Sequence, residues 1–338
     1  MIKKITYLLI PIFLLLYLYI ISGKSNLKGN FDRAYVSSTT ITAKDTVEGY
    51  NIDGMLYNNG LLWINGRSQI FSLDSTAQIR NRIVVNTNIN SPIVNFYVQN
   101  DTLFYYLGNT SKISYLPISN SLTSTKTISL KFPITDFLKL SNGYLLFELI
   151  PRNGSLCVKY IEKDTLQEFN NFYVDKIEGG AMSYSGKFLK NSNMSLFIPF
   201  YRDSIRIIDN SLKVDILKPI DSINQKIKIN KVGDRFSLDA NTRIIRIGAG
   251  ISKDFLFLSS FVLASEESEK SFKEGTTIDI YRIRDKKYLL SFKIPNFNKK
   301  MVDDFVVSDN YLLAASYRNN IVIYDMRRFV KLFLNKNE

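Results

Sequence analysis

Carboxylate and amide side chains recur at one place in a repeated sequence pattern. Asp53, Asn95, Asp136 and Asp304 each lie a few residues before a leucine that opens an apolar stretch. If these positions meet at one point, their oxygen atoms could bind a hard cation such as Ca²⁺. They could also do acid–base chemistry, provided that crowding separates their pKa values. The structural alternative is that each side chain only caps nearby backbone groups.

Basic side chains recur at a second place, in the turns that follow those apolar stretches. The predicted binding residues are Arg67, Lys112, Arg152, Arg202 and Arg318, together with Lys299 and Lys300 before the last repeat. Gathered around one opening, these cations would attract an anionic partner. Arginine would suit a carboxylate or phosphate best, because its guanidinium binds in two places at once. The plainer alternative is that charged residues are ordinary in solvated turns.

The amino-acid composition excludes several classes of enzyme. The 338 residues include no histidine and one cysteine, Cys157. Histidine-dependent serine or cysteine catalysis, histidine-ligated zinc or haem and an intramolecular disulfide are therefore excluded. The basic residues number 44 and the acidic ones 31, which gives a net charge of +13.

The chain between residues 36 and 334 consists of repeated short strands. Apolar runs rich in β-branched and aromatic residues alternate with Asn, Asp, Gly and Ser clusters, as in strands and turns. The leucines that open the second strand of each repeat are 42, 42, 51, 60 and 56 residues apart; they are Leu61, Leu103, Leu145, Leu196, Leu256 and Leu312. This period is typical of β-propeller blades. We therefore expect an all-β, six-bladed β-propeller, with seven blades or a two-sheet sandwich as alternatives.

Two insertions and a closing strand complete this expectation. The longer repeats contain insertions at 221–234 and 265–275, and the second is so charged that we expect a solvated hairpin. A strand at 36–42 could close the ring beside residues 320–326, and residues 329–334 compete for the same edge. Either solution would protect an edge strand. Residues 335–338 would form a short tail.

The first 35 residues have the character of a membrane-targeting segment. Lys3 and Lys4 precede an apolar run that extends from Ile5 to Ser22. The run is long for a cleaved signal peptide, so we expect an uncleaved signal anchor at 1–22 and a tether at 23–35. The remaining chain would lie on the exported side of the membrane, or be secreted if the segment is cleaved. An exported chain would seldom meet nucleic acid, so we expect no nucleic-acid partner.

In its repeat layout the chain resembles the six-bladed β-propellers of the TolB-like and NHL-like kind found in bacterial envelopes. This resemblance implies that the first strand of each blade lines a central channel. It also implies that the basic turns and the strand starts share one face, where such propellers bind their ligands. We therefore expect a non-catalytic, membrane-tethered propeller that binds a protein, peptide or glycan and needs no cofactor. The alternative is a Ca²⁺-dependent hydrolase or lactonase that uses Asp53, Asn95, Asp136 and Asp304.

Overall fold

The computed structural model describes residues 27–334 apart from several stretches, the longest of which are 37–40, 86–91, 120–124, 151–154 and 169–182. The predicted anchor at 1–22, the tail at 335–338, Arg67 and Arg152 lie outside the described residues. Within the described part, no helix has both the length and the apolar character needed to cross a membrane.

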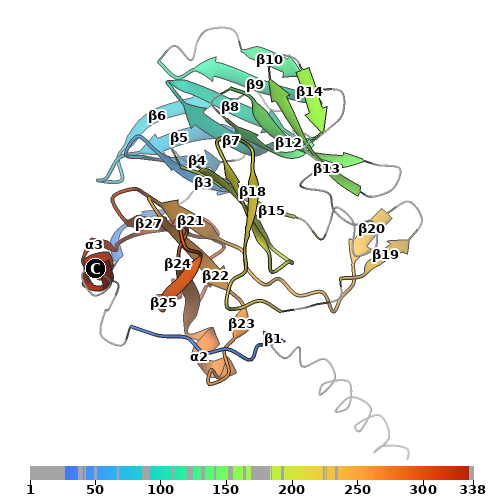
Figure 1. Cartoon of the computed structure of the whole chain (residues 1–338). Helices are drawn as coiled ribbons and strands as arrows, with labels where there is room; N and C mark the ends of the chain where they lie inside the picture. The colour runs from blue at the N-terminus through green and yellow to red at the C-terminus, as the bar shows by residue number, and fades with distance from the viewer. Residues whose placement is uncertain are drawn as a thin grey trace, which may run out of the picture.

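The described strands form a β-propeller in which five blades are each built from one stretch of the chain (Figure 1). The first contains β3 (Gly54–Asn58), β4 (Leu61–Gly66), β5 (Gln69–Leu73) and β6 (Ile79–Val84). The second contains β7 (Ile93–Gln99), β8 (Thr102–Leu107), β9 (Lys112–Pro117) and β10 (Lys126–Ser129). The third contains β11 (Ile134–Lys139), β12 (Tyr144–Ile150), β13 (Ser155–Glu162) and β14 (Thr165–Glu168). The fourth contains β15 (Gly186–Lys190), β16 (Met194–Pro199), β17 (Ile205–Asp209) and β18 (Val214–Leu217).

The fifth blade and the closing sheet complete the ring. Blade five contains β21 (Ala249–Ser252), β22 (Phe255–Ser260), β24 (Gly275–Arg282) and β25 (Lys287–Pro295). The closing sheet joins β26 (Asp304–Val307), β27 (Leu312–Tyr317) and β28 (Asn320–Asp325) to β2 (Ala43–Glu48). The blade count therefore differs from the predicted six: five blades each come from one stretch of the chain, and the remaining four-stranded sheet is a composite of β2 with β26, β27 and β28.

The strand that closes the ring differs from the predicted one. The strand that pairs with the outer edge of β28 is β2, which is later in the chain than the expected 36–42 segment. The competing segment is also not a strand, because residues 327–334 form the helix α3 (Arg327–Leu334). The Asp325 carboxylate accepts a hydrogen bond from the Arg327 N–H at 3.0 Å, which favours a helix start there. Phe329 and Val330 on this helix are buried against blade five and the closing sheet.

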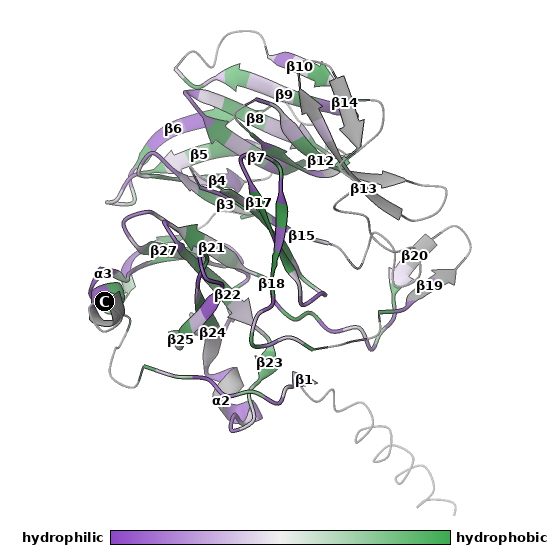
Figure 2. Cartoon of the chain, viewed as in Figure 1, coloured by the Kyte–Doolittle hydropathy of each residue, from purple (hydrophilic) through white to green (hydrophobic). Residues whose placement is uncertain are grey.

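The apolar pattern explains the packing between blades. The predicted leucines all lie in the second strand of a sheet, as expected. One buried cluster joins Phe257 of β22, Val307 of β26 and Leu313 of β27, so blade five and the closing sheet share a core. Figure 2 shows hydrophobic residues along the strands of the blades. Burial of apolar surface between neighbouring sheets therefore supplies most of the force that holds the ring together.

The segment expected to be a free tether lies against blade five. Its strand β1 (Leu27–Lys28) pairs in parallel with β23 (Val262–Leu263), and Ser291 of β25 donates its N–H to the Ala34 carbonyl. We call the docked residues 27–36 the N-terminal arm. The tether prediction for 23–35 is therefore wrong for its described part, because the arm has specific partners on blade five.

The two insertions also differ from the expectation. The 265–275 segment contains a short helix, α2 (Glu269–Lys273), and the Glu267 side chain is only 9% exposed because it pairs with Arg33. The first insertion contains β19 (Ile229–Val232), which pairs with β20 (Arg235–Leu238) just beyond the predicted end at residue 234, and Asp221 at its beginning is buried. The prediction that all charges of the second insertion are solvated is therefore wrong, because Glu267 pairs with Arg33, which is 234 residues away in the sequence.

Candidate functional site

The inner strands lie around the central axis of the ring, which we call the channel, and place one end of each strand on the same face. Strand β3 contacts β7 and β26, β7 contacts β11, and β21 contacts β15 and β26. Because neighbouring strands of a blade run in opposite directions, the start of the first strand and the turn between the second and third strands share one end. The bond from the Asp53 N–H to the Asn65 carbonyl, at 2.9 Å, joins these two places in the first blade. We call this end the upper face and the opposite end the lower face.

Two of the predicted channel residues contact one another directly. The Asn95 amide of β7 donates a hydrogen bond to the Asp136 carboxylate of β11 and another to the Phe137 carbonyl at 3.2 Å. These contacts join blades two and three at the start of their inner strands. The predicted convergence of Asn95 and Asp136 therefore occurs in the structure.

A third predicted residue pairs with a cation that the sequence analysis missed. Lys187 Nζ lies 2.8 Å from each oxygen of the Asp304 carboxylate and 3.2 Å from the Phe305 carbonyl oxygen. The two side chains are 18% and 27% exposed, so the ion pair is only partly shielded from water. It joins β15 of blade four to β26 of the closing sheet across the upper end of the channel.

A signal for Lys187 was present in the sequence. Asn95, Asp136 and Asp304 each precede a phenylalanine that is buried in the structure, and Lys187 precedes Phe188 in the same way. The predicted set was restricted to oxygen ligands of a hard cation, so it left out a basic residue at the equivalent place. The repeat predicted the position, but not the sign of the charge.

The capping role predicted as the structural alternative is also present. The side-chain oxygens of Asn95, Asp136 and Asp304 each accept a hydrogen bond from the N–H of the following phenylalanine, at 2.7, 2.7 and 2.8 Å. Each side chain thus satisfies a backbone donor at the point where its strand begins. Asp53 is exposed and lies at the same end of its blade.

Burial changes the protonation of the central carboxyl group. Desolvation raises the pKa of Asp136 to about 7, and this effect is opposed by the hydrogen bond from Asn95 and the charge of Lys187. Desolvation likewise raises the pKa of Asp304, although the adjacent Lys187 favours its charged form. The channel mouth therefore holds one carboxylate paired with an ammonium and one carboxyl group that titrates near neutral pH.

The arrangement at the mouth bears on the predicted cation site. Among the described residues, no group of three or more acidic, histidine or cysteine side chains is placed to hold a metal ion. The Lys187 ammonium already contacts both oxygens of Asp304. These residues therefore form a mixed-charge polar cluster, which we call the channel cluster: Asn95, Asp136, Lys187 and Asp304.

The described members of the predicted basic rim lie on the upper face. Lys112 and Arg318 are exposed in turns that join second and third strands, and Lys299 is exposed in the loop that enters β26, as Lys300 partly is. The Arg318 N–H donates a hydrogen bond to the Asp303 carboxylate, which brings this turn next to that loop. Acidic side chains share the face, since Asp53 and Asp303 are also exposed. The rim is thus basic in excess, but not uniformly so.

Arg202 is the rim member with the most structural contacts. Its guanidinium donates to Ser183 Oγ at 3.3 Å, and its carbonyl accepts a hydrogen bond from Arg246 at 2.8 Å. Arg246 also forms a fully buried ion pair with Asp221 at 2.9 Å. This buried pair fixes the base of the first insertion beside the rim.

Comparison with known proteins extends the fold assignment. Neither the known protein families nor the curated proteins include a match to this chain. A solved structure of a DUF4221-family member from Bacteroides vulgatus is similar, with a TM-score of 0.51, 13% identity and coverage of 85% of this chain and 97% of that one. A chain of the mitotic checkpoint complex has a TM-score of 0.51 at 8% identity, covering 89% and 99% of the two chains. The WD40 domain of Neurospora crassa Pan2 has a TM-score of 0.50 at 10% identity, covering 86% and 97%.

These similarities concern the fold only, because identities of 8–13% are too low to carry a function. Together with the ring of four-stranded sheets, they show that the chain is a β-propeller.

Proposed function

We propose that this chain is a non-catalytic, six-bladed β-propeller of the cell envelope, with the composite sheet as its sixth blade. It is held at a membrane by residues 1–22 and exposed on the exported side. It binds a negatively charged protein, peptide or glycan on its upper face, and no nucleic acid. The observation that carries the proposal is the placement of exposed cations at the turns and loops of the upper face.

The charges of the described upper face support an anionic partner. Lys112 extends from a turn of blade two, whereas Lys299 and Arg318 extend from neighbouring loops beside the closing sheet, so exposed cations lie at two places on the upper face. An excess of one sign of charge on a surface attracts ligands of the opposite sign and speeds their association. Arginine and lysine at the rim of an interface contribute chiefly to association rate and salt dependence.

The channel cluster supplies a polar floor inside this rim. Its ion pair and amide–carboxylate contact leave it close to electrically balanced, so it does not repel an anionic ligand as a set of bare carboxylates would. Partly exposed donors and acceptors can fix the orientation of a bound group. The rim would thus attract the partner and the channel cluster would orient it.

The test is capture of the partner by crosslinking in native membranes, followed by comparison of two sets of charge reversals. The first set combines Lys112→Glu, Lys299→Glu and Arg318→Glu on the upper face. The control set combines Lys213→Glu, Arg328→Glu and Lys331→Glu, whose positions follow third strands and so lie on the lower face. We expect the upper set to abolish capture and the control set to leave it unchanged. Equal capture by both variants would contradict the proposal.

A Ca²⁺-dependent hydrolase is the second candidate, favoured by the carboxyl group of Asp136 that titrates near neutral pH beside Asn95. Such a group can serve as a general acid or base. Calorimetric titration with Ca²⁺, together with hydrolysis of simple esters and lactones, tests this candidate. Ca²⁺ binding and turnover that are both lost in Asp136→Asn would favour the enzyme over the binding protein.

A further inference from the structure

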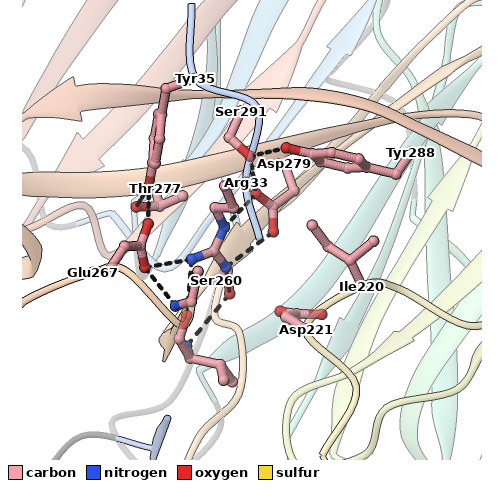
Figure 3. A network of polar contacts seen from close by, with 12 residues as sticks. Arg33, Tyr35, Ile220, Asp221, Ser260, Glu267, Thr277, Asp279, Tyr288 and Ser291 are labelled. Atoms are coloured by element: carbon pink, nitrogen blue, oxygen red, sulfur yellow. Dashed lines mark hydrogen bonds and ion pairs between the residues drawn. The ribbon is translucent and has the colours of Figure 1, made fainter. Parts of the chain in front are cut away.

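The N-terminal arm is fixed to blade five by one buried arginine (Figure 3). Arg33 Nε donates to the Asp279 carboxylate at 2.9 Å, and Nη2 donates to the other oxygen at 3.2 Å. Nη1 donates to Glu267 at 2.6 Å and to the Val262 carbonyl at 3.0 Å, and Nη2 donates to Ser260 Oγ at 2.6 Å. The guanidinium therefore makes five hydrogen bonds, which is its full capacity.

The surroundings of Arg33 make this contact hard to break. Its side chain and that of Asp279 are each 1% exposed. Removing one partner of a buried ion pair leaves an unpaired charge in a region without water, which is strongly unfavourable. The Asp279 carboxylate is also held by Ser291 Oγ at 2.5 Å, so the acidic side of the pair is fixed independently of the arm.

Contacts on both sides of Arg33 extend the attachment. Tyr35 donates its hydroxyl to Glu267, and Tyr288 donates its hydroxyl to Ser291 Oγ or accepts from it, while also accepting the Ala34 N–H at 3.0 Å. On the other side, the Gly29 N–H donates to the Leu263 carbonyl at 2.9 Å. The arm is thus held along its length rather than at a single point.

The arm begins very close in sequence to the apolar run. The run ends at Ser22 and β1 begins at Leu27, so only residues 23–26 separate them. Even fully extended, that stretch spans at most about 18 Å from Ser22 to Leu27. If the run is in a membrane, the edge of blade five where β1 meets β23 must lie near the membrane surface.

We propose that the arm is a rigid mount that holds the ring on edge, with blade five and α2 against the lipid surface and blade two farthest from it. This inference rests on the membrane anchoring in the proposed function and adds an orientation and a lipid-facing surface to it. Blades two and five lie opposite each other, because their inner strands β7 and β21 are three places apart in the ring. The exposed residues Lys270 on α2 and Lys126 on β10 mark these two sides.

The experiment places a fluorophore on each side of the ring in the full chain. Lys270→Cys and Lys126→Cys are each labelled in a Cys157→Ser background and reconstituted into phosphatidylcholine vesicles that contain nitroxide-headgroup lipid. We expect lipid quenching at position 270 to be several times greater than at position 126. A Gly-Ser linker inserted after Ser25 should remove this difference, since it frees the arm from the membrane but leaves Arg33 docked. The same linker inserted after Ser121 is the control and should leave the difference intact.

The outcomes separate the mount from the anchor. A chain that does not float with the vesicles would contradict membrane anchoring, and the mount with it. A chain that floats but is quenched equally at both positions would overturn the mount alone, as would a difference that survives the linker after Ser25. Arg33→Ala gives a second test: if circular dichroism shows a folded chain, quenching at position 270 should fall to the level at position 126.

Discussion

The residues at the channel mouth combine structural and chemical roles. Asn95, Asp136 and Asp304 cap the strand starts, and the same side chains meet a neighbour from another blade. The sequence could predict that these positions lie at the starts of inner strands, because the repeat fixes them relative to the leucines. It could not predict that Lys187 would neutralise Asp304, because this pairing joins blade four to the closing sheet across the channel.

A pH dependence of stability follows from Asp136. Burial raises the pKa of Asp136 to about 7 in the folded chain, while an unfolded aspartate titrates near about 4. Between these values the folded state binds more protons than the unfolded state, so stability decreases as pH rises through this range. We expect Asp136→Asn to become more stable relative to the original chain as pH rises from 4 to 7. Urea denaturation across this range measures the effect, and an unchanged difference between the two chains would contradict it.

At the scale of the element, inner strands approach one another most closely between blade five and the closing sheet. A Cβ atom on Gly250 of β21 would lie 2.6 Å from Val307 Cγ2 and 2.9 Å from the Val307 backbone nitrogen. Gly248 is similarly close to Phe305 of β26. The glycines therefore allow β21 to pack directly against β26.

Gly250→Ala should destabilise the ring, because the backbone nitrogen of Val307 cannot move as a side-chain end can. We expect a loss of about 1–3 kcal/mol in the free energy of unfolding, as is usual for overpacking. Gly54→Ala on β3 is the matched control, since its Cβ would meet its nearest neighbour at an ordinary 3.8 Å. Denaturant unfolding of both variants is the measurement, and equal stability would show that the close approach has no energetic role.

The repeated sequence pattern predicted the strands of the blades better than it predicted the structure near the two ends of the chain. The leucines marked the second strands correctly, because the same order of strands and turns recurs in every blade. The helix α3 was missed because its apolar residues are also compatible with an edge strand, and the deciding contacts are with blade five. The arm was missed because Arg33 finds Asp279, which is 246 residues away. The sequence placed Arg33 only within the predicted tether.

At the scale of the whole molecule, the N-terminal segment joins the last parts of the ring. The arm lies on blade five, and β2 then completes the closing sheet beside β28. The net charge of +13 belongs to the whole chain, and part of it lies in the exposed cations at the upper-face turns. The central claim is that the upper face, rather than basic charge in general, binds the partner.

Photo-crosslinking from single positions tests this claim most directly. A photoreactive residue replaces Lys112 or Arg318 on the upper face and Lys213 or Arg328 on the lower face, in the full chain in native membranes. We predict that both upper positions crosslink the same partner, that the yield decreases with added salt, and that the lower positions do not crosslink it. Crosslinks to that partner mainly from Lys213 and Arg328, or equally from both faces, would contradict the account.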